Sequence, residues 1–291
     1  PGVAVLAWNK EILIDAGYSE TDSIVTEGPS SWAEWEAAME RVYSKLASDR
    51  VYAGGVYAGG NTGGYMRVGA LMDSAGGSYD DAEGLPDLNT QANRDAFEFV
   101  RRMRDLNRDG VCNAYDEATY FNAFTRGNIA YKIDGTWAIC EDEEAGIDAG
   151  YSLIPPQTEG GEQGSLIIGA TYMSVPQYAE NAEVAFALIE RFLQEDIQQN
   201  IADGGLRFPV LKSIFESEEY RAEHPEFYMF ANYATENDVR GVPSFDGNIS
   251  DLWTAVSNAI TLAYAPGNST PIADILQNAQ NLMTEAYNAY N

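Results

Sequence analysis

Apolar strand-like segments alternate with amphipathic helical segments along this chain, and that alternation limits its possible folds more than any other feature. Four segments have the continuous or alternating apolar pattern of strands: residues 3–8, 129–133, 149–156 and 165–175. Helical patterns fill the intervals, and in the clearest, Asn93–Asn107, the side chains of Phe97, Val100 and Met103 share one stripe. Strands that alternate with helices predict a layered α/β fold.

Capping signals predict where several helices begin or end. Ser31 is expected to be an N-cap, with Glu34 three residues later closing a reciprocal capping box. Thr270 is expected to cap the last helix, with Pro271 in its first position. Residues 183–202 predict the longest helix of the chain. Its apolar residues are expected to face inward: Val184, Leu188, Ile189, Phe192, Leu193 and Ile197.

The charge balance is strongly acidic, with 45 Asp and Glu against 17 Lys and Arg and a formal net charge of −28. A surface of this sign cannot displace counterions from phosphates, which excludes nucleic acid as a partner. Two interpretations remain open: a field that attracts a cationic ligand, or a surface adapted to high salt, where the Debye length falls to roughly 3 Å. Because the acidic residues are spread along the chain, we favour a halophilic acidic surface.

At 291 residues the chain is long enough for two packed units. No apolar run reaches the ~18–20 residues of a membrane span. The chain opens on "PGVAVLAWNK", which has the pattern of a strand interior and not of a signal peptide, so we expect it to be cut from a longer protein. Its two cysteines, Cys112 and Cys140, fit either one disulfide or two buried thiols.

The motifs of common catalytic sites are missing from the sequence. Its single histidine, His224, lies in the polar stretch "RAEHPEF" and is expected at the surface. No nucleophile elbow, phosphate-binding glycine loop or His/Cys metal cluster occurs. We therefore predict no catalytic residues.

One segment has the spacing of a calcium loop. Asp105, Asn107 and Asp109 fall at positions 1, 3 and 5, Gly110 follows at the glycine position, and Asp116 stands at position 12 in place of glutamate. The alternative is a helix that ends at Gly110 among solvated acids.

The stretch "GNIAYKIDGTW" places a large aromatic residue just after a strand. Its alternating run, residues 129–133, predicts a half-buried strand that ends at Asp134-Gly135. Trp137 follows on the loop that leaves it, and the pattern alone fits either a core residue at the sheet edge or the wall of a binding cleft.

Seven stretches, in this order, resemble motifs of family 1 extracellular solute-binding proteins of ABC importers, the group that includes maltose-binding protein. They are "VLAWNKEILIDAG", "PSSWAEWEAAMERV", "MDSAGGSYDDAEG", "YFNAFTRGNIAYKIDGTWAI", "SVPQYAENAEVAFALIERFL", "GGLRFPVLKSIF" and "GNSTPIADILQNA". The fourth is the most specific, because the family has a Gly-x-x-Ala-Met-x-x-x-Gly-x-Trp pattern there.

This resemblance implies a fold like that of type II periplasmic-binding proteins, with two lobes joined by a hinge. Residues 1–9 would be the hinge strand, residues 10–170 and 230–291 the second lobe, and residues 171–229 a helical portion that packs with the first lobe. Most of the first lobe would be absent from this chain.

The resemblance also implies a set of ligand-binding residues. Trp137 would stack on the flat face of a sugar ring, because the pyranose face is apolar and its rim carries hydroxyl groups. Trp253 and Tyr65 would be further cleft aromatics, with Asn61 beside Tyr65 as a hydrogen-bonding residue. Three more residues would face the same region: Tyr172, Arg207 as a forked donor or a structural ion pair, and Asp246 as an acceptor.

The function implied is non-enzymatic capture of a sugar or oligosaccharide outside the cell or in the periplasm. The partner would be the membrane subunits of an ABC permease, and the protein would be a monomer, anchored through a segment before residue 1, with no cofactor apart from the possible calcium. Two alternatives stay open: a carbohydrate-active enzyme with the same aromatics as subsites, and the same binding fold with a cationic or peptide ligand.

Overall fold

The computed structural model describes residues 2–47, 51–57, 62–107, 117–168, 172–204, 208–237 and 249–289, together with residues 239, 241, 243 and 245. Its centre is an antiparallel sheet around β1 (Gly2–Asn9), which pairs with three strands: β2 (Tyr131–Gly135), β3 (Ala149–Ser152) and β4 (Ile167–Ile168). All four predicted strand segments therefore contribute a strand, and the α/β class is confirmed.

The central strand β1 is buried from Val3 onward, because both of its faces are covered. Ala4, Leu6 and Trp8 belong to the main hydrophobic cluster, whereas Val3 and Val5 belong to a second cluster. Strand β2 is also buried along its whole length. The prediction of a half-buried strand at residues 129–133 was wrong in this respect, since its polar face is covered as well as its apolar face.

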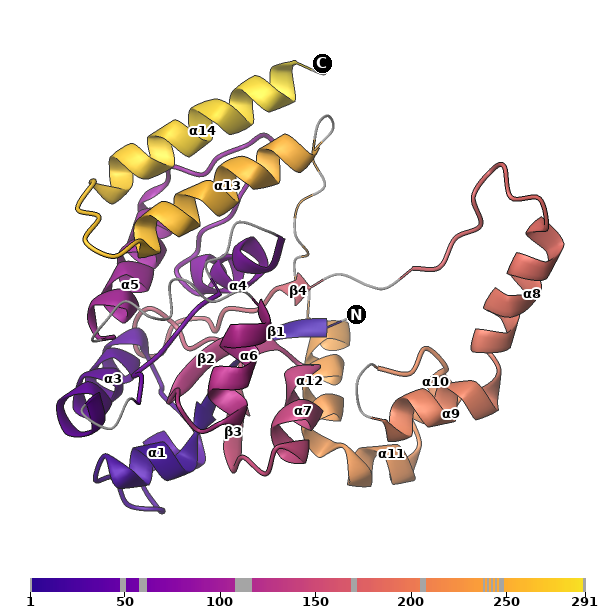
Figure 1. Cartoon of the computed structure of the whole chain (residues 1–291), viewed down its shortest axis with the longest axis horizontal. Helices are drawn as coiled ribbons and strands as arrows, with labels where there is room; N and C mark the ends of the chain where they lie inside the picture. The colour runs from indigo at the N-terminus through magenta and orange to yellow at the C-terminus, as the bar shows by residue number, and fades with distance from the viewer. Residues whose placement is uncertain are drawn as a thin grey trace.

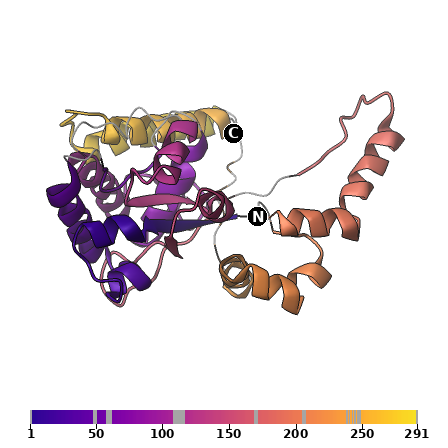
Figure 2. The ribbon, with the colours of Figure 1, turned by 60° about the horizontal axis from the view of Figure 1, so that its bottom comes forward.

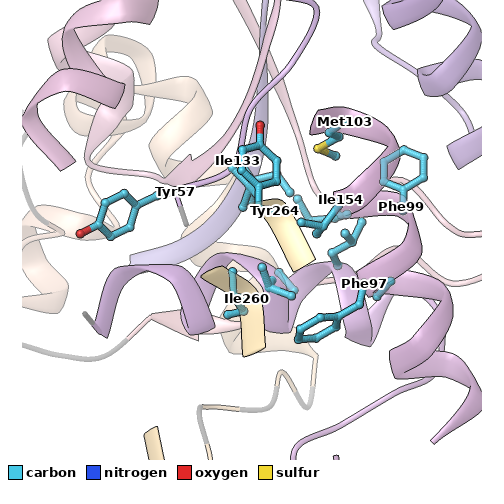
Figure 3. Packing of buried hydrophobic residues seen from close by; sticks show 14 of the residues in the cluster. Tyr57, Phe97, Phe99, Met103, Ile133, Ile154, Ile260 and Tyr264 are labelled. Carbon is cyan, nitrogen blue, oxygen red and sulfur yellow. The ribbon is translucent and has the colours of Figure 1, made fainter. Parts of the chain in front are cut away.

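Helices surround the sheet and form the body of the molecule (Figure 1). They are α1 (Lys10–Asp15), α2 (Ser23–Thr26), α3 (Trp32–Leu46), α4 (Thr62–Asp73), α5 (Gln91–Asp105), α6 (Glu117–Thr125), α7 (Ala138–Glu144), α13 (Ile249–Tyr264) and α14 (Ile272–Asn288). Helix α13 packs against α4, α5 and α14. Figure 3 shows part of the main cluster, where Phe97 and Phe99 of α5, Ile260 and Tyr264 of α13 and Ile133 of β2 lie close together.

The predicted helix starts are partly confirmed. The Ser31 hydroxyl accepts the Glu34 amide at 3.4 Å, as an N-cap should. The Glu34 carboxylate, however, accepts from the amide and hydroxyl of Ser30, each at 2.7 Å, so the reciprocal half of the box was wrong. Helix α14 begins at Ile272 with Pro271 as its N-cap in an extended conformation, so the prediction of Thr270 at that position was also wrong.

Five further helices form what we call the arm, which extends away from the body in Figures 1 and 2. They are α8 (Ala182–Phe192), α9 (Glu195–Asp203), α10 (Lys212–Phe215), α11 (Glu218–Glu223) and α12 (Pro225–Glu236). The arm meets the body through α12, where Phe227 and Phe230 join Val3 and Val5 in the second cluster.

The longest predicted helix, residues 183–202, is two helices in the structure. Gln194 is extended (ψ 148°) and separates α8 from α9. The predicted inward packing of Val184, Leu188, Phe192 and Leu193 was wrong, because these side chains are exposed. The apolar stripe correctly indicated a hydrophobic surface, but no described part of the chain covers that surface.

Candidate functional site: an aromatic surface over a buried charge network

Trp137 lies in the turn between β2 and α7. That turn is fixed to β1, because the Thr136 amide donates to the Val3 carbonyl at 3.0 Å and the Val3 amide donates to the Thr136 hydroxyl at 3.4 Å. The Trp137 ring is partly buried and packs against the main cluster. It is therefore an ordered indole with some of its surface open.

Two glycines make room for the Trp137 ring. A Cβ atom on Gly135 would lie 2.2 Å from the ring, and one on Gly2 would lie 2.9 Å from it. Both distances are shorter than real Cβ contacts, so the indole lies directly on the backbone of β2 and β1. We call these two residues the glycine floor.

A second group of aromatic rings gathers around Trp253 near the start of α13. Tyr65 of α4 stacks on the Trp253 ring with centroids 4.2 Å apart and an angle of 14° between the planes. Tyr79 meets the same indole edge-on at 5.2 Å, and Phe245 lies at 5.8 Å. This aromatic cluster joins segments that are 188 residues apart in the sequence.

The aromatic cluster is closely packed and electrically neutral. Trp253 is 7% exposed and Tyr65 is 6% exposed, because each ring covers a face of the other. The Tyr79 hydroxyl donates to the Tyr65 carbonyl. Burial raises the pKa of both tyrosines, so the phenols stay protonated. The cluster is therefore almost closed to solvent, and Trp137 is the less enclosed ring.

The other predicted ligand residues are less informative. Tyr172 is described and is 86% exposed, at the start of the segment that leads to the arm. Asn61, Arg207 and Asp246 lie outside the described residues. Of the predicted set, the structure thus brings Tyr65 and Trp253 into direct contact and packs Trp137 against the same main cluster.

Four buried charges lie beneath the turn that carries Trp137, and we call them the charge network. Arg67 of α4 donates to Asp134 of β2 at 2.6 Å, and Lys132 of β2 donates to Asp142 of α7 at 2.7 Å. Their side chains are between 0% and 2% exposed. The Tyr151 hydroxyl of β3 donates to Asp142 at 3.0 Å. The network therefore joins α4, β2, α7 and β3.

Electrostatics within the charge network follow from its burial. Desolvation raises the pKa of Asp142, while the Lys132 ammonium opposes that rise. Burial, followed by the charge of Asp142, raises the pKa of Tyr151. The Lys132 ammonium also lies 4.2 Å from the centre of the Phe124 ring.

The charge network was not predicted from the sequence. A signal was present, because Lys132 is one of only four lysines in the chain and stands two residues from Asp134 in a strand. The Arg67 and Asp142 partners come from separate helices, and no local pattern pairs them with β2.

The calcium prediction stays a prediction. Asp109 and Asp116 lie outside the described residues, while Asp105 pairs with Arg104 at 2.7 Å. The Asn107 amide bridges the backbone of Ala53 and Gly54. Within the described parts of the chain, no three His, Cys, Asp or Glu side chains form a group that could hold a metal.

The disulfide question also stays open, because Cys112 lies outside the described residues. Cys140 is buried in the second cluster. Burial and nearby glutamates raise the pKa of its thiol to about 11.

No helix in the described ranges is long and apolar enough to cross a membrane.

Three solved structures illustrate the similarity of this fold to known ones. An ABC transporter solute-binding protein from Thermotoga lettingae, bound with alpha-D-tagatose, is 16% identical and aligns over 97% of this chain and 70% of its own, with a TM-score of 0.77. For maltose-bound MalE3 of T. maritima, the identity is 17%, the coverage 98% and 70%, and the TM-score 0.76. For the GacH receptor of Streptomyces glaucescens, these values are 20%, 100% and 70%, and 0.72.

Sequence comparison gives the family directly. No curated protein matches the chain. The sequence model described as bacterial extracellular solute-binding protein matches residues 2–199, which is more than half of the chain. With the α/β fold and the structural similarities, this match confirms the family that the seven stretches predicted: the chain belongs to the bacterial extracellular solute-binding proteins.

Proposed function

We propose that this chain is the extracellular carbohydrate-binding component of an ABC importer, which captures a sugar or sugar alcohol and delivers it to permease subunits in the membrane. The observation that carries the proposal is the partly open Trp137 ring on its glycine floor, packed against the main cluster that also contains Tyr65 and Trp253. Similar structures bound with alpha-D-tagatose, maltose and D-mannitol support this ligand class.

The chemistry of the site suits a carbohydrate. A flat indole desolvates the C–H face of a sugar ring, and polar groups around the ring satisfy its hydroxyls. The tyrosines of the aromatic cluster stay neutral and bring no charge to the site. The protein acts by binding alone, without altering the sugar.

The domain organisation is part of the same proposal. Residues 1–9 form the hinge strand, and residues 10–170 and 230–291 form the second lobe. The arm covers most of residues 171–229, and its exposed apolar side chains are the surface that a first lobe would bury. Val184, Phe186 and Leu188 of α8 are 58–69% exposed. A group of exposed apolar side chains indicates an interaction surface, whereas a single one does not.

The exposed face of α8 should bind a hydrophobic dye. We expect the 291-residue chain to enhance the fluorescence of anilinonaphthalene sulfonate, because Phe186 and Leu188 each expose more than half of a large apolar side chain. The double variant Phe186→Gln/Leu188→Gln should lower that signal by about half or more. Ala187→Gln on the same exposed stretch is the matched control and should leave it unchanged. Equal signals from wild type and double variant would show that the dye reports another surface.

Ligand binding is tested by thermal melting of the purified chain with maltotriose, acarbose, D-mannitol or spermidine. A ligand that binds only the folded chain, present at 100 times its Kd, stabilises it by about 2.7 kcal/mol. We expect a carbohydrate to raise Tm while chromatography of the sugar shows no cleavage. Cleavage products would favour the carbohydrate-active enzyme, a shift with spermidine alone would favour a cationic ligand, and no shift would contradict the proposal.

A further inference from the structure

Asp134 connects the two aromatic parts of the site. Its Oδ1 atom accepts from the Gly135 amide at 2.9 Å and from Arg67 Nη2 at 2.6 Å. The side chains of Asp134 and Arg67 are 0% and 2% exposed. One carboxylate oxygen thus holds both the last residue of β2 and a side chain of α4.

Each partner of Asp134 is next to an aromatic residue of the site. Gly135 is part of the glycine floor on which the Trp137 ring lies. Arg67 is two residues after Tyr65, whose ring stacks on Trp253. The buried ion pair therefore joins the end of β2, on which the Trp137 ring lies, to α4, the helix that carries Tyr65.

The Arg67–Asp134 pair is expected to fix orientation more than to add stability. Removing two charges from water costs about as much as their attraction returns, so a buried ion pair is often no more stabilising than packed apolar residues. Its hydrogen bonds, in contrast, require particular distances and angles. An apolar pair at residues 67 and 134 would fill the space without fixing the orientation of Gly135 relative to α4.

We propose that Arg67 and Asp134 are positioning residues, which set the placement of the Trp137 ring relative to the Tyr65–Trp253 stack and thereby the affinity for carbohydrate. The effect on affinity rests on the proposed function, whereas the placement of the ring does not. Neither side chain touches the ligand.

The charge network supplies its own matched control. Arg67→Met/Asp134→Asn removes one cation and one anion and leaves the Lys132–Asp142 pair. Lys132→Met/Asp142→Asn removes the same charges and leaves the Arg67–Asp134 pair. Lys132 Nζ also lies 3.9 Å from Asp134 Oδ2, and both doubles remove this longer contact equally. Both doubles remove a buried ion pair from β2, at 2.6 Å and 2.7 Å respectively, so a purely structural role predicts similar effects from each.

The readout that does not depend on ligand is fluorine NMR of protein labelled with 5-fluorotryptophan, in which Trp137→Phe assigns one of the five tryptophan resonances. We expect the Trp137 resonance to shift or broaden in Arg67→Met/Asp134→Asn and to stay at its wild-type position in Lys132→Met/Asp142→Asn. Arg67→Lys keeps a cation that can reach Asp134 and should retain the wild-type resonance. If the first double does not fold, Arg67→Lys is compared with the wild type in its place.

The second readout is the Kd for whichever of maltotriose, acarbose or D-mannitol stabilises the wild type. We expect a rise of about tenfold for Arg67→Met/Asp134→Asn and less than about twofold for the control double. An unchanged Trp137 resonance in the first double, or equal changes in both doubles, overturns the proposal. If no carbohydrate binds the wild type, the proposed function fails, and the resonances still decide whether the pair positions the ring.

Discussion

Replacing Lys132 alone with methionine is expected to lower the free energy of unfolding by about 3–5 kcal/mol, because it leaves the Asp142 carboxylate buried without its cation. Lys132 and Asp142 are both 0% exposed and 2.7 Å apart. Urea denaturation at pH 8 measures the loss. Lys132→Met/Asp142→Asn, which leaves no uncompensated charge there, should recover most of it.

The loss should be smaller at low pH. Burial already raises the pKa of Asp142, and without Lys132 the pKa rises further because the ammonium was lowering it. A carboxyl with a raised folded pKa binds more protons in the native state, so stability falls as pH rises from the ordinary value of about 3.9 through the folded pKa. Lys132→Met should therefore lose less stability at pH 5 than at pH 8. A deficit independent of pH, or a double variant as unstable as the single one, would contradict this account.

Replacing Trp137 with alanine is expected to raise the Kd for carbohydrate about thirtyfold or more, equivalent to about 2 kcal/mol. The ring is partly open, and the glycine floor holds it in place, so its open surface is ordered before the ligand arrives. Gly135→Ala should weaken binding in the same direction although the indole remains, because the added methyl group occupies the position of the ring. Isothermal titration calorimetry measures both variants.

The control for this experiment is Trp35→Phe. Trp35 is 0% exposed and packs on Phe99 and Tyr131 in the main cluster. It is not one of the proposed ligand-binding residues. Its replacement should lower Tm and leave the Kd unchanged. Wild-type affinity in Trp137→Ala would remove this ring from the site, and wild-type affinity in Gly135→Ala alone would show that the floor does not orient it.

Local sequence patterns predicted the parts of this molecule that depend on local chemistry. The four strands and helix α5 follow from apolar periodicity, and Ser31 follows from its capping chemistry. The position of Trp137 after a strand was also readable, because a short polar turn separates the two.

Features that depend on distant partners could not be predicted in the same way. The alternating pattern of β2 predicted a solvated polar face. In the structure, Phe124 of α6 and Asp142 of α7 cover Lys132 on that face. The stacking of Tyr65 on Trp253 needs two helices far apart in the chain. The apolar stripe of α8 predicted burial, but periodicity does not identify the surface against which these side chains pack.

The hydrogen bonds between Thr136 and Val3 have a mechanical consequence. Val3 also belongs to the second cluster with Phe227 and Phe230 of the arm, so one residue contacts both the arm and the turn that carries Trp137. If the arm rotates in the proposed two-lobe protein, Val3 would transmit that motion to the Thr136 amide through their hydrogen bond. The rate at which that amide exchanges its proton with solvent is thus a local gauge of lobe motion.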